Sequence, residues 1–215
     1  MGVIVLEHCD CDLFHYLKKS PGDHEEIKRL FFQVCTAIQQ CHRHNIAHLD
    51  LKPGNVLLVN GQIRICDFGS SCKWSKTVPT CSRVTGTSNY QAPEVYKGNE
   101  YSPAPVDCWG LGVLLHVMLA NCFPFGESKT NIKIASTIGK EGSSLIRSLL
   151  QYDPQERPTI DEIISHDYFL ASKKSETAQE LEFDSSEFQA QEIYPHNKFR
   201  IVQRTLSLFK LFSTK

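Results

Sequence analysis

Apolar residues recur along the first part of the chain at the spacing of an amphipathic helix. The clearest case is residues 23–45, where Asp23 is placed to cap a helix and Glu26 to complete a capping box. A shorter helix is predicted over 12–19, because Ser20-Pro21-Gly22 ends its pattern. The apolar side chains that would share one face of the longer helix are Ile27, Leu30, Phe31, Val34 and Ile38.

Other elements are predicted from apolar runs and turn residues. Residues 3–7 (VIVLE) indicate a short buried strand, and the runs at 55–59 and 62–68 flank Asn60-Gly61, a pair typical of tight hairpins. Residues 70–92 have little periodicity and are predicted to form a long loop. Further helices are predicted over 106–120, which is apolar almost all round, and over 143–151 and 159–169.

Composition narrows the class of protein. The 215 residues are 41% hydrophobic and 22% charged, as expected for a globular protein, and the length suits one domain with appendages or two small domains. A formal net charge of -1 gives no bulk attraction to nucleic acid. No apolar run reaches the roughly 20 residues of a membrane span, and no basic flank of a signal peptide follows Met1. We therefore expect a cytoplasmic protein with no nucleic-acid partner and no membrane span.

The nine cysteines are odd in number, scattered, and absent after Cys122. With no sign of secretion, this pattern predicts free thiols in a reducing compartment and no disulfide framework. The cysteines and histidines between Cys35 and His48 match no paired zinc-ligand spacing. Packing thiols and surface imidazoles are favoured there over a metal site.

Residues 48–58 (HLDLKPGNVLL) carry the strongest chemical signal. Asp50, Lys52 and Asn55 bring a carboxylate, an ammonium and a carboxamide onto one loop. Phosphoryl transfer needs a carboxylate to orient the attacking hydroxyl, a cation near the moving phosphoryl group, and oxygen ligands for magnesium. Asp67, in CDFGS after the predicted hairpin, supplies a second hard oxygen ligand.

In order and spacing, HLDLKPGN, CDFG and QAPE (91–94) resemble the catalytic loop, the Asp-Phe-Gly motif and the Ala-Pro-Glu motif of eukaryotic protein kinases. The resemblance implies an α+β, mainly α-helical fold: a kinase-like C-terminal lobe with a small catalytic-loop hairpin and most of the N-terminal lobe absent. The implied divisions are the end of an N-lobe strand plus the hinge (1–11), the C-lobe (12–171), and a tail (172–215).

The resemblance assigns a role to each motif residue. It implies that Asp50 is the catalytic base, Lys52 contacts phosphate, and Asn55 and Asp67 bind Mg²⁺. ATP is the implied cofactor. A serine or threonine of a protein is the implied acceptor, because a lysine two residues after the aspartate, here Lys52, is typical of serine/threonine kinases. Supporting roles are implied for Thr87, which would brace the loop, for Asp107, and for an ion pair between Arg157 and Glu94.

The same resemblance implies a nucleotide pocket. Leu6 would be the gatekeeper, and the backbone at Glu7 and Cys9 would meet the adenine edge. Asp12 would reach the ribose and Leu57 would form the floor under the base. The remaining implied contact is Cys66, the residue before Asp-Phe-Gly.

Leu49 departs from the usual family pattern, since most regulated kinases have an arginine there that binds a phosphate on the activation loop. The presence of Leu49 in place of this arginine argues against a switch in which a phosphate orders the activation loop. HLDLKP resembles both the Mos family and the myosin-light-chain-kinase group, and ICDFGSS in a cysteine-rich context favours Mos. That resemblance implies a signalling kinase, with a downstream kinase among its candidate substrates.

A glycine-rich phosphate loop and its strand lysine do not occur in these residues. Gly110 and Gly112 lie in an apolar helix without a third glycine and are interpreted as packing residues. We therefore expect a fragment or truncated form of a kinase that by itself binds ATP–magnesium weakly and does not catalyse. The alternative is an inactive kinase lobe that acts as a protein-binding module.

The tail separates its charges. Residues 176–187 carry only acidic charges, and residues 198–215 carry only basic ones with an apolar helical face. Two hypotheses remain for the basic segment. It packs back on the lobe, or it docks on a partner, a calmodulin-like protein or a membrane surface.

Overall fold

The computed structural model describes residues 7–19, 23–126 and 131–170. The predicted strand at 3–7, Leu6 and the whole tail from 171 therefore lie outside the described residues, except for Glu7. The helices are α1 (Leu13–Lys19), α2 (His24–Arg43), α3 (Pro93–Tyr96), α4 (Pro103–Ala120), α5 (Lys140–Leu149), α6 (Ile160–Ile164) and α7 (Asp167–Leu170). The strands are β1 (Cys11–Asp12), β2 (Ile46–Ala47), β3 (Val56–Val59), β4 (Gln62–Ile65) and β5 (Cys72–Lys73).

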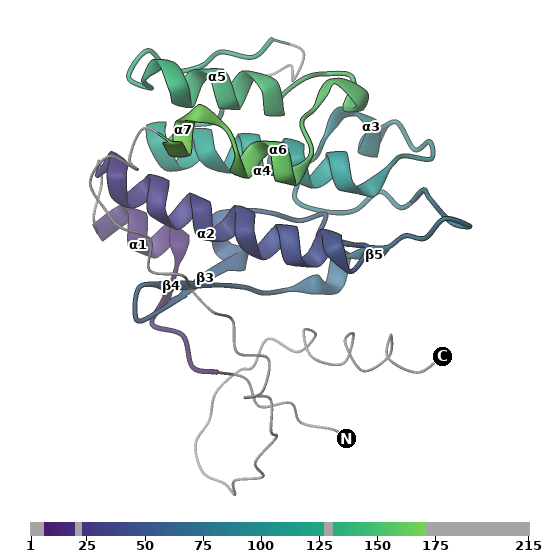
Figure 1. The fold of residues 1–215 in the computed structure, drawn as a ribbon, viewed down its shortest axis with the longest axis horizontal. Coiled ribbons are helices and arrows are strands. Elements are labelled where there is room, and N and C mark those ends of the chain that lie inside the picture. Colours follow the sequence, from purple (N-terminus) through teal and green to yellow (C-terminus); the bar gives the residue numbers. More distant parts are fainter. Residues whose placement is uncertain (1–6, 20–22, 127–130, 171–215) are drawn as a thin grey trace, which may run out of the picture.

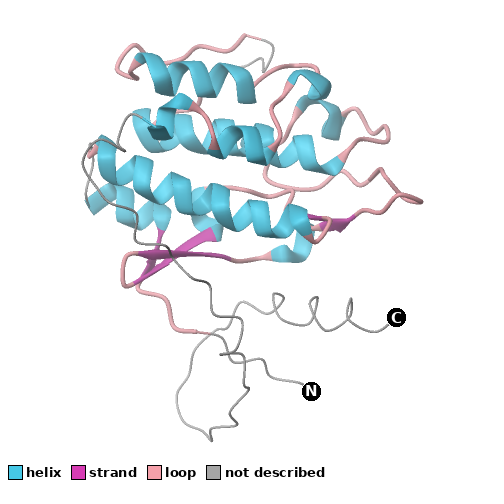
Figure 2. Ribbon diagram, viewed as in Figure 1, coloured by secondary structure: helices cyan, strands magenta, loops and turns pink. Residues whose placement is uncertain are grey.

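The helices stack in layers, with the strands at one edge. In Figure 1, α2 lies between the small sheet and the layer that holds α4, and α5 covers the far side of α4. Figure 2 shows that helices dominate and that the hairpin of β3 and β4 lies on the side of α2 away from α4 and α5. The short pair of β2 and β5 lies elsewhere, near the C-terminal end of α2 (Figure 1), where β2 contacts both α2 and α4. The mainly helical α+β character predicted from the sequence is confirmed.

Helix α2 follows its sequence pattern closely. The Asp23 carboxylate accepts hydrogen bonds from the N–H groups of Glu25 and Glu26, both at 3.1 Å, so the predicted cap is confirmed. The predicted capping box is wrong, because the Glu26 carboxylate binds the Tyr16 hydroxyl at 2.8 Å and Arg29 Nε at 2.6 Å. The five predicted face residues are all buried.

The predicted hairpin forms, and a third strand joins it. Asn60 and Gly61 have φ of 50° and 75°, so both residues adopt the left-handed conformation that a tight type I′ turn requires. Strand β3 pairs antiparallel with β4 on one side and with β1 on the other. The sequence did not indicate β1, which is only two residues long.

Helix α4 is the buried centre of the fold. A Cβ added at Gly112 would lie 2.8 Å from Leu149 Cβ, and one at Gly110 would lie 3.3 Å from Leu51 Cβ. The two glycines therefore let neighbouring segments approach closely, as their interpretation as packing residues required. By length and composition α4 could cross a membrane, but 72% of its apolar window is buried inside the fold.

The single helix predicted over 159–169 is two short helices. Thr159 and Glu162 form a reciprocal capping box that starts α6. The chain turns at Ser165 and His166, where the imidazole Nδ1 of His166 accepts the N–H of Tyr168 at 3.1 Å. The Ser165 hydroxyl donates back to the Asp161 carbonyl at 2.9 Å where α6 ends, and the His166 contact begins α7. Apolar spacing does not reveal such contacts of side chains with the backbone.

The cysteine prediction is wrong at one pair. Cys72 and Cys81 form a disulfide, and the other seven cysteines are free. The bond arises because the loop after β5 folds back on itself and brings together two cysteines nine positions apart. Counting and spacing of cysteines gave no sign of this pairing.

Candidate active site

The loop between β2 and β3 carries Asp50, and Asp107 on α4 fixes that loop. The Asp107 side chain is fully buried and accepts the N–H groups of His48 and Leu49, each at 2.8 Å. It also contacts His42 Nε2 at 2.8 Å. Three donors thus converge on one buried carboxylate, which attaches the loop backbone to the core helix.

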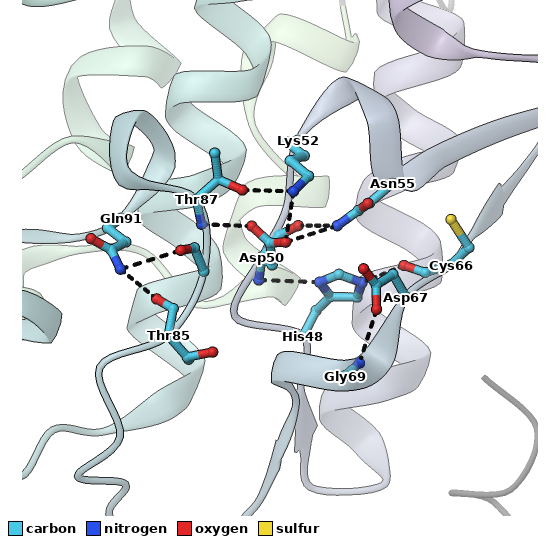
Figure 3. A network of polar contacts seen from close by, with 11 residues as sticks. His48, Asp50, Lys52, Asn55, Cys66, Asp67, Gly69, Thr85, Thr87 and Gln91 are labelled. Carbon is cyan, nitrogen blue, oxygen red and sulfur yellow. Dashed lines mark hydrogen bonds and ion pairs between the residues drawn. The ribbon is translucent and has the colours of Figure 1, made fainter. Parts of the chain in front are cut away.

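Asp50 is the centre of a polar network (Figure 3). Its Oδ1 accepts the N–H of Thr87 at 2.8 Å, and its Oδ2 accepts Lys52 Nζ at 2.9 Å and Asn55 Nδ2 at 3.1 Å. Lys52 Nζ also donates to Thr87 Oγ1 at 2.6 Å. The carboxylate is therefore held in one orientation by donors from both the 48–55 loop and the segment before QAPE.

Asn55 connects this network to Asp67. Asn55 Nδ2 also donates to the Asp50 carbonyl at 2.8 Å, so the amide nitrogen is committed to the loop. The Asn55 carbonyl accepts the N–H of Cys66 at 3.0 Å, which places the Asp-Phe-Gly segment beside Asn55. The carboxamide oxygen of Asn55 accepts no hydrogen bond from the described residues.

Asp67 and Asn55 carry oxygen donors of the kind that a magnesium site would need. Asp67 has φ 60° and ψ 65°, a left-handed conformation that aspartate tolerates better than most residues. From the part of the chain that the structure describes, its Oδ1 accepts a single long hydrogen bond, from Gly69 N–H at 3.3 Å. A carboxylate and a carboxamide oxygen are the hard ligands that Mg²⁺ takes, with water and phosphate completing its shell.

His48 holds the Asp-Phe-Gly turn from below. Its Nδ1 accepts the N–H of Asp50 at 3.2 Å, and its Nε2 lies 2.9 Å from the Cys66 carbonyl. These partners assign the tautomer with the proton on Nε2. The ring packs edge-on against Phe68, with centroids 4.9 Å apart, so one buried imidazole orients both motifs.

Two predicted nucleotide residues are direct neighbours across strands. Asp12 on β1 pairs in register with Leu57 on β3, and side chains of paired residues project from the same face of a sheet. Leu57 is partly exposed, whereas Val56 and Leu58 on either side of it are buried. Leu57 therefore faces away from the core, as a floor under a base would require.

The Asp12 carboxylate is already engaged. It accepts the backbone N–H and the Nδ1 of His15, both at 2.8 Å. Burial by itself would raise the pKa of Asp12, but the hydrogen bonds from His15 outweigh it and hold that pKa below its usual range. The carboxylate is thus ionised and able to accept hydroxyl hydrogen bonds.

The other predicted nucleotide contacts are neighbours of one another. Cys9 lies beside both Glu7 and Cys66. Glu7 Oε2 pairs with Arg64 Nε at 2.9 Å, and Arg64 lies opposite Leu57 in the hairpin. Burial, with Asp67 nearby, raises the pKa of Cys66 to about 11, and burial and Glu7 raise that of Cys9. Both thiols are therefore protonated near neutral pH and act as packing groups rather than nucleophiles.

The predicted pair of Glu94 and Arg157 is present, with Arg157 buried and Glu94 partly exposed. Arg157 Nη1 and Nη2 meet the two carboxylate oxygens of Glu94 at 2.6 and 2.9 Å. Arg157 also donates to the carbonyls of Pro105 and Gln151, each at 2.8 Å. This bidentate pair ties the QAPE segment to the start of α4.

Sequence reasoning missed three residues that position the site. His42 is one donor to Asp107, and Gln91 Nε2 donates to the Thr85 carbonyl at 2.7 Å. Gly86 has φ 88°, and a Cβ there would lie 2.5 Å from the Leu49 carbonyl oxygen. A glycine next to Thr87 was visible as a signal, but the close contact depends on how two distant loops meet.

Comparison with known proteins agrees with this geometry. Residues 2–169 match the protein kinase domain family. The chain belongs to that family.

Three curated relatives of this chain are each called a kinase. The chain is 31% identical to an Aurora kinase of Schizosaccharomyces pombe over 80% of this chain and 51% of that protein. It is 37% identical to the SNF1-like protein kinase ssp2 of the same yeast, over 78% of this chain and 31% of that protein. It is 33% identical to the carbon catabolite-derepressing protein kinase of Saccharomyces cerevisiae, over 78% of this chain and 28% of that protein. The chain therefore spans about half or less of the length of these curated relatives.

Proposed function

We propose that this chain carries the phosphoryl-transfer site of a serine/threonine protein kinase, which moves the γ-phosphoryl group of ATP to a protein hydroxyl. The observation that supports this most is the Asp50 carboxylate, held at once by Thr87, Lys52 and Asn55. A carboxylate so fixed can orient a substrate hydroxyl and accept its proton as the oxygen attacks.

The neighbouring groups have complementary roles in this proposal. Lys52, between Asp50 and Thr87, can turn its ammonium toward the moving phosphoryl group and offset its negative charge. Asn55 and Asp67 would hold Mg²⁺, which neutralises phosphate charge when bound. Leu57 and Asp12 would receive the base and the ribose of ATP.

The names of the relatives favour an enzyme over the alternative of an inactive binding module, since each is called a kinase. The Mos-like subfamily remains a hypothesis based on Leu49 and on ICDFGSS in a cysteine-rich chain. With it remain the proposals of a downstream kinase as substrate and of a cytoplasmic location.

The test is transfer of labelled phosphate to protein. The 215-residue chain and, in parallel, the longest in-frame product of its transcript are incubated with γ-labelled ATP, MgCl₂ and a peptide library that contains serine, threonine and tyrosine. Asp50→Asn is the test variant, because it keeps the shape of the side chain and removes the base. Asp167→Asn, the same change at an exposed position on α7, is the matched control.

We expect labelled phosphate on serine or threonine. The rate of transfer should fall by at least about a hundredfold in Asp50→Asn, because a positioned acid–base group contributes a rate factor of that size. Asp167→Asn is expected to behave as the unmodified protein. Circular dichroism should show that Asp50→Asn stays folded. Absence of transfer by both products, label only on tyrosine, or full activity of Asp50→Asn would overturn the proposal.

A further inference from the structure

The disulfide lies in the segment that links two parts of the candidate active site. Cys72 follows Asp67 by five residues, and Cys81 precedes Thr87 by six. We propose that Cys72 and Cys81 form a reversible redox clamp that orders this segment and thereby controls the site. The proposal rests on the proposed function for its effect on catalysis, but not for the clamp itself.

The Cys72 end is fixed to the catalytic loop. Strand β5 pairs antiparallel with β2, with Ala47 opposite Cys72. Trp74 N–H donates to the Asn45 carbonyl at 3.0 Å, so the chain from Cys72 to Trp74 is bonded to the stretch that leads into His48. Cys72 thus has a defined position, independent of its partner.

The Cys81 end is fixed to the entry of α4. Cys81 and Tyr101 exchange two backbone hydrogen bonds, at 2.9 and 2.8 Å, and Tyr101 is buried. The Tyr101 hydroxyl donates to the Arg83 carbonyl at 2.7 Å. The disulfide therefore joins two anchored points, one on each side of the 73–80 loop.

A weaker tie runs parallel to the disulfide. Arg83 Nη2 donates to the carbonyls of Ser70 and Ser71, at 3.0 and 2.9 Å, but the Arg83 side chain is exposed. Exposed contacts of this kind contribute little because water competes for the same groups. The covalent bond is thus the strong link between the Asp67 side of the segment and the Thr87 side.

Leu49 explains why a covalent link is useful here. Leu49 is buried and apolar, and it stands where a cation would be needed to hold a phosphate on this segment. The ordering that a phosphate–arginine contact gives elsewhere would be supplied by the bond between Cys72 and Cys81. Both cysteines are partly exposed, so small oxidants and reductants reach them.

The chemistry balances with a peroxide and a dithiol. One thiolate attacks hydrogen peroxide to give a sulfenic acid and water, and the second thiol displaces the sulfenic oxygen as a second water to form the S–S bond. Two thiols are oxidised and one peroxide is reduced. A dithiol reverses the step through a mixed disulfide and is itself oxidised to a disulfide.

The first test identifies the bond by mass spectrometry. Trypsin cleaves after Arg64, Lys73, Lys76 and Arg83, so Cys72 leaves in peptide 65–73 and Cys81 in peptide 77–83. After peroxide treatment of the whole chain, we expect the two peptides joined, and fragmentation should assign the link to Cys72 rather than to Cys66. Treatment with dithiothreitol should separate them. Peptides that stay separate after peroxide, or a link through Cys66, would overturn the proposal.

The second test measures order without relying on catalysis. Hydrogen exchange of the amides at 82–87 is compared between oxidised and reduced protein. We expect exchange at least about tenfold faster after reduction, below the ceiling of about a hundredfold that chain entropy sets for so short a loop. Cys72→Ser/Cys81→Ser should match the reduced protein under both conditions. Cys122→Ser, which removes an exposed free thiol, should still respond to peroxide.

Equal rates of hydrogen exchange in the oxidised and reduced protein would refute the proposed redox clamp, whether or not the protein is a kinase. If exchange responds and labelled-phosphate transfer is present, transfer by the oxidised form should exceed that by the reduced form by several-fold. Transfer that is equal in both states would overturn control of the site. Failure of the proposed function is seen separately, as transfer that Asp50→Asn leaves unchanged.

Discussion

The buried carboxylate of Asp107 holds the backbone of Leu49, with Oδ1 2.8 Å from the Leu49 nitrogen. Leu49 has φ 64°, an uncommon conformation for a large side chain, so the loop needs this external support. The contact transmits the position of the core helix α4 to Asp50, the next residue. The packing of α4 in the core therefore also sets the position of Asp50 in the candidate active site.

We predict that Asp107→Asn destabilises the protein. The carboxamide presents an N–H₂ group to one of the three donors, and a buried unpaired donor costs about 1–3 kcal/mol. Urea unfolding should show the loss as a lower midpoint. The exposed change Asp167→Asn should leave the midpoint nearly unchanged. Equal midpoints for the two variants would mean that Asp107 does not support the loop.

Gly86→Ala is predicted to impair phosphoryl transfer. A Cβ at this position would lie 2.5 Å from the Leu49 carbonyl oxygen, so the loops that carry Asp50 and Thr87 must separate. Small displacements of reacting groups lower rates by roughly tenfold to a hundredfold. Gly98→Ala is the matched control, because Gly98 also has a positive φ, of 72°, but open space around it. Similar turnover in both variants would contradict the role of the close contact.

Gly112→Ala should destabilise the fold more than Gly110→Ala does. Both changes replace glycine by alanine inside a helix, which by itself stabilises the helix by up to about 1 kcal/mol. At Gly112 the new Cβ would lie 2.8 Å from Leu149 Cβ, whereas at Gly110 the closest atom, Leu51 Cβ, would be 3.3 Å away. Overpacking of this kind costs about 1–3 kcal/mol. Thermal unfolding of the two variants gives the order, and the reverse order would refute the packing argument.

Stability should fall on mild acidification because of His116. This imidazole is fully buried between α4 and the segment after it, with Nδ1 2.9 Å from the Cys122 carbonyl and Nε2 accepting the Ala135 N–H at 3.1 Å. Burial lowers the pKa of His116. The unfolded chain, with a histidine pKa of about 6.5, therefore binds the proton first, so stability is present above that pH and is lost below it.

The variant His116→Gln tests this linkage. It should be less stable at neutral pH and should lose less stability between about pH 7.5 and pH 5.5 than the unmodified protein does. Urea midpoints at the two pH values give the comparison. His24→Gln, at an exposed position on α2, should keep the full pH dependence. An unchanged slope in His116→Gln would show that another group titrates.

Activity is predicted not to depend on a phosphate in the 70–92 loop. Thr77, Ser82 and Thr85 are potential acceptors, but Leu49 offers no charge to hold a phosphate. The cations within the loop, among them Lys73 and Arg83, do not replace an arginine next to Asp50. Phosphatase treatment should leave phosphoryl transfer within a few-fold of the untreated rate. A collapse of the rate would show that Arg83 or another cation takes the role of the missing arginine.

Several features followed from the sequence because they are local. The cap and buried face of α2, the Asn60-Gly61 turn and the buried character of α4 each depend on residues within a few positions of one another. The kinase motifs were recognisable for the same reason, since short spacing on one loop fixes Asp50, Lys52 and Asn55 relative to each other. The error over 159–169 arose where two side chains, those of Ser165 and His166, bind the backbone.

The sequence by itself determined most of the helices, the Asn60-Gly61 turn, the buried face of α2, and which residues are candidates for the chemistry. Only the tertiary structure decided the partners: Asp107 with Leu49, 58 positions apart, Asp12 with Leu57 across β1 and β3, and Cys72 with Cys81. The physical reason is that apolar periodicity specifies that a face is buried but not against what. Contacts between distant segments depend on how all the helices pack around α4 at once.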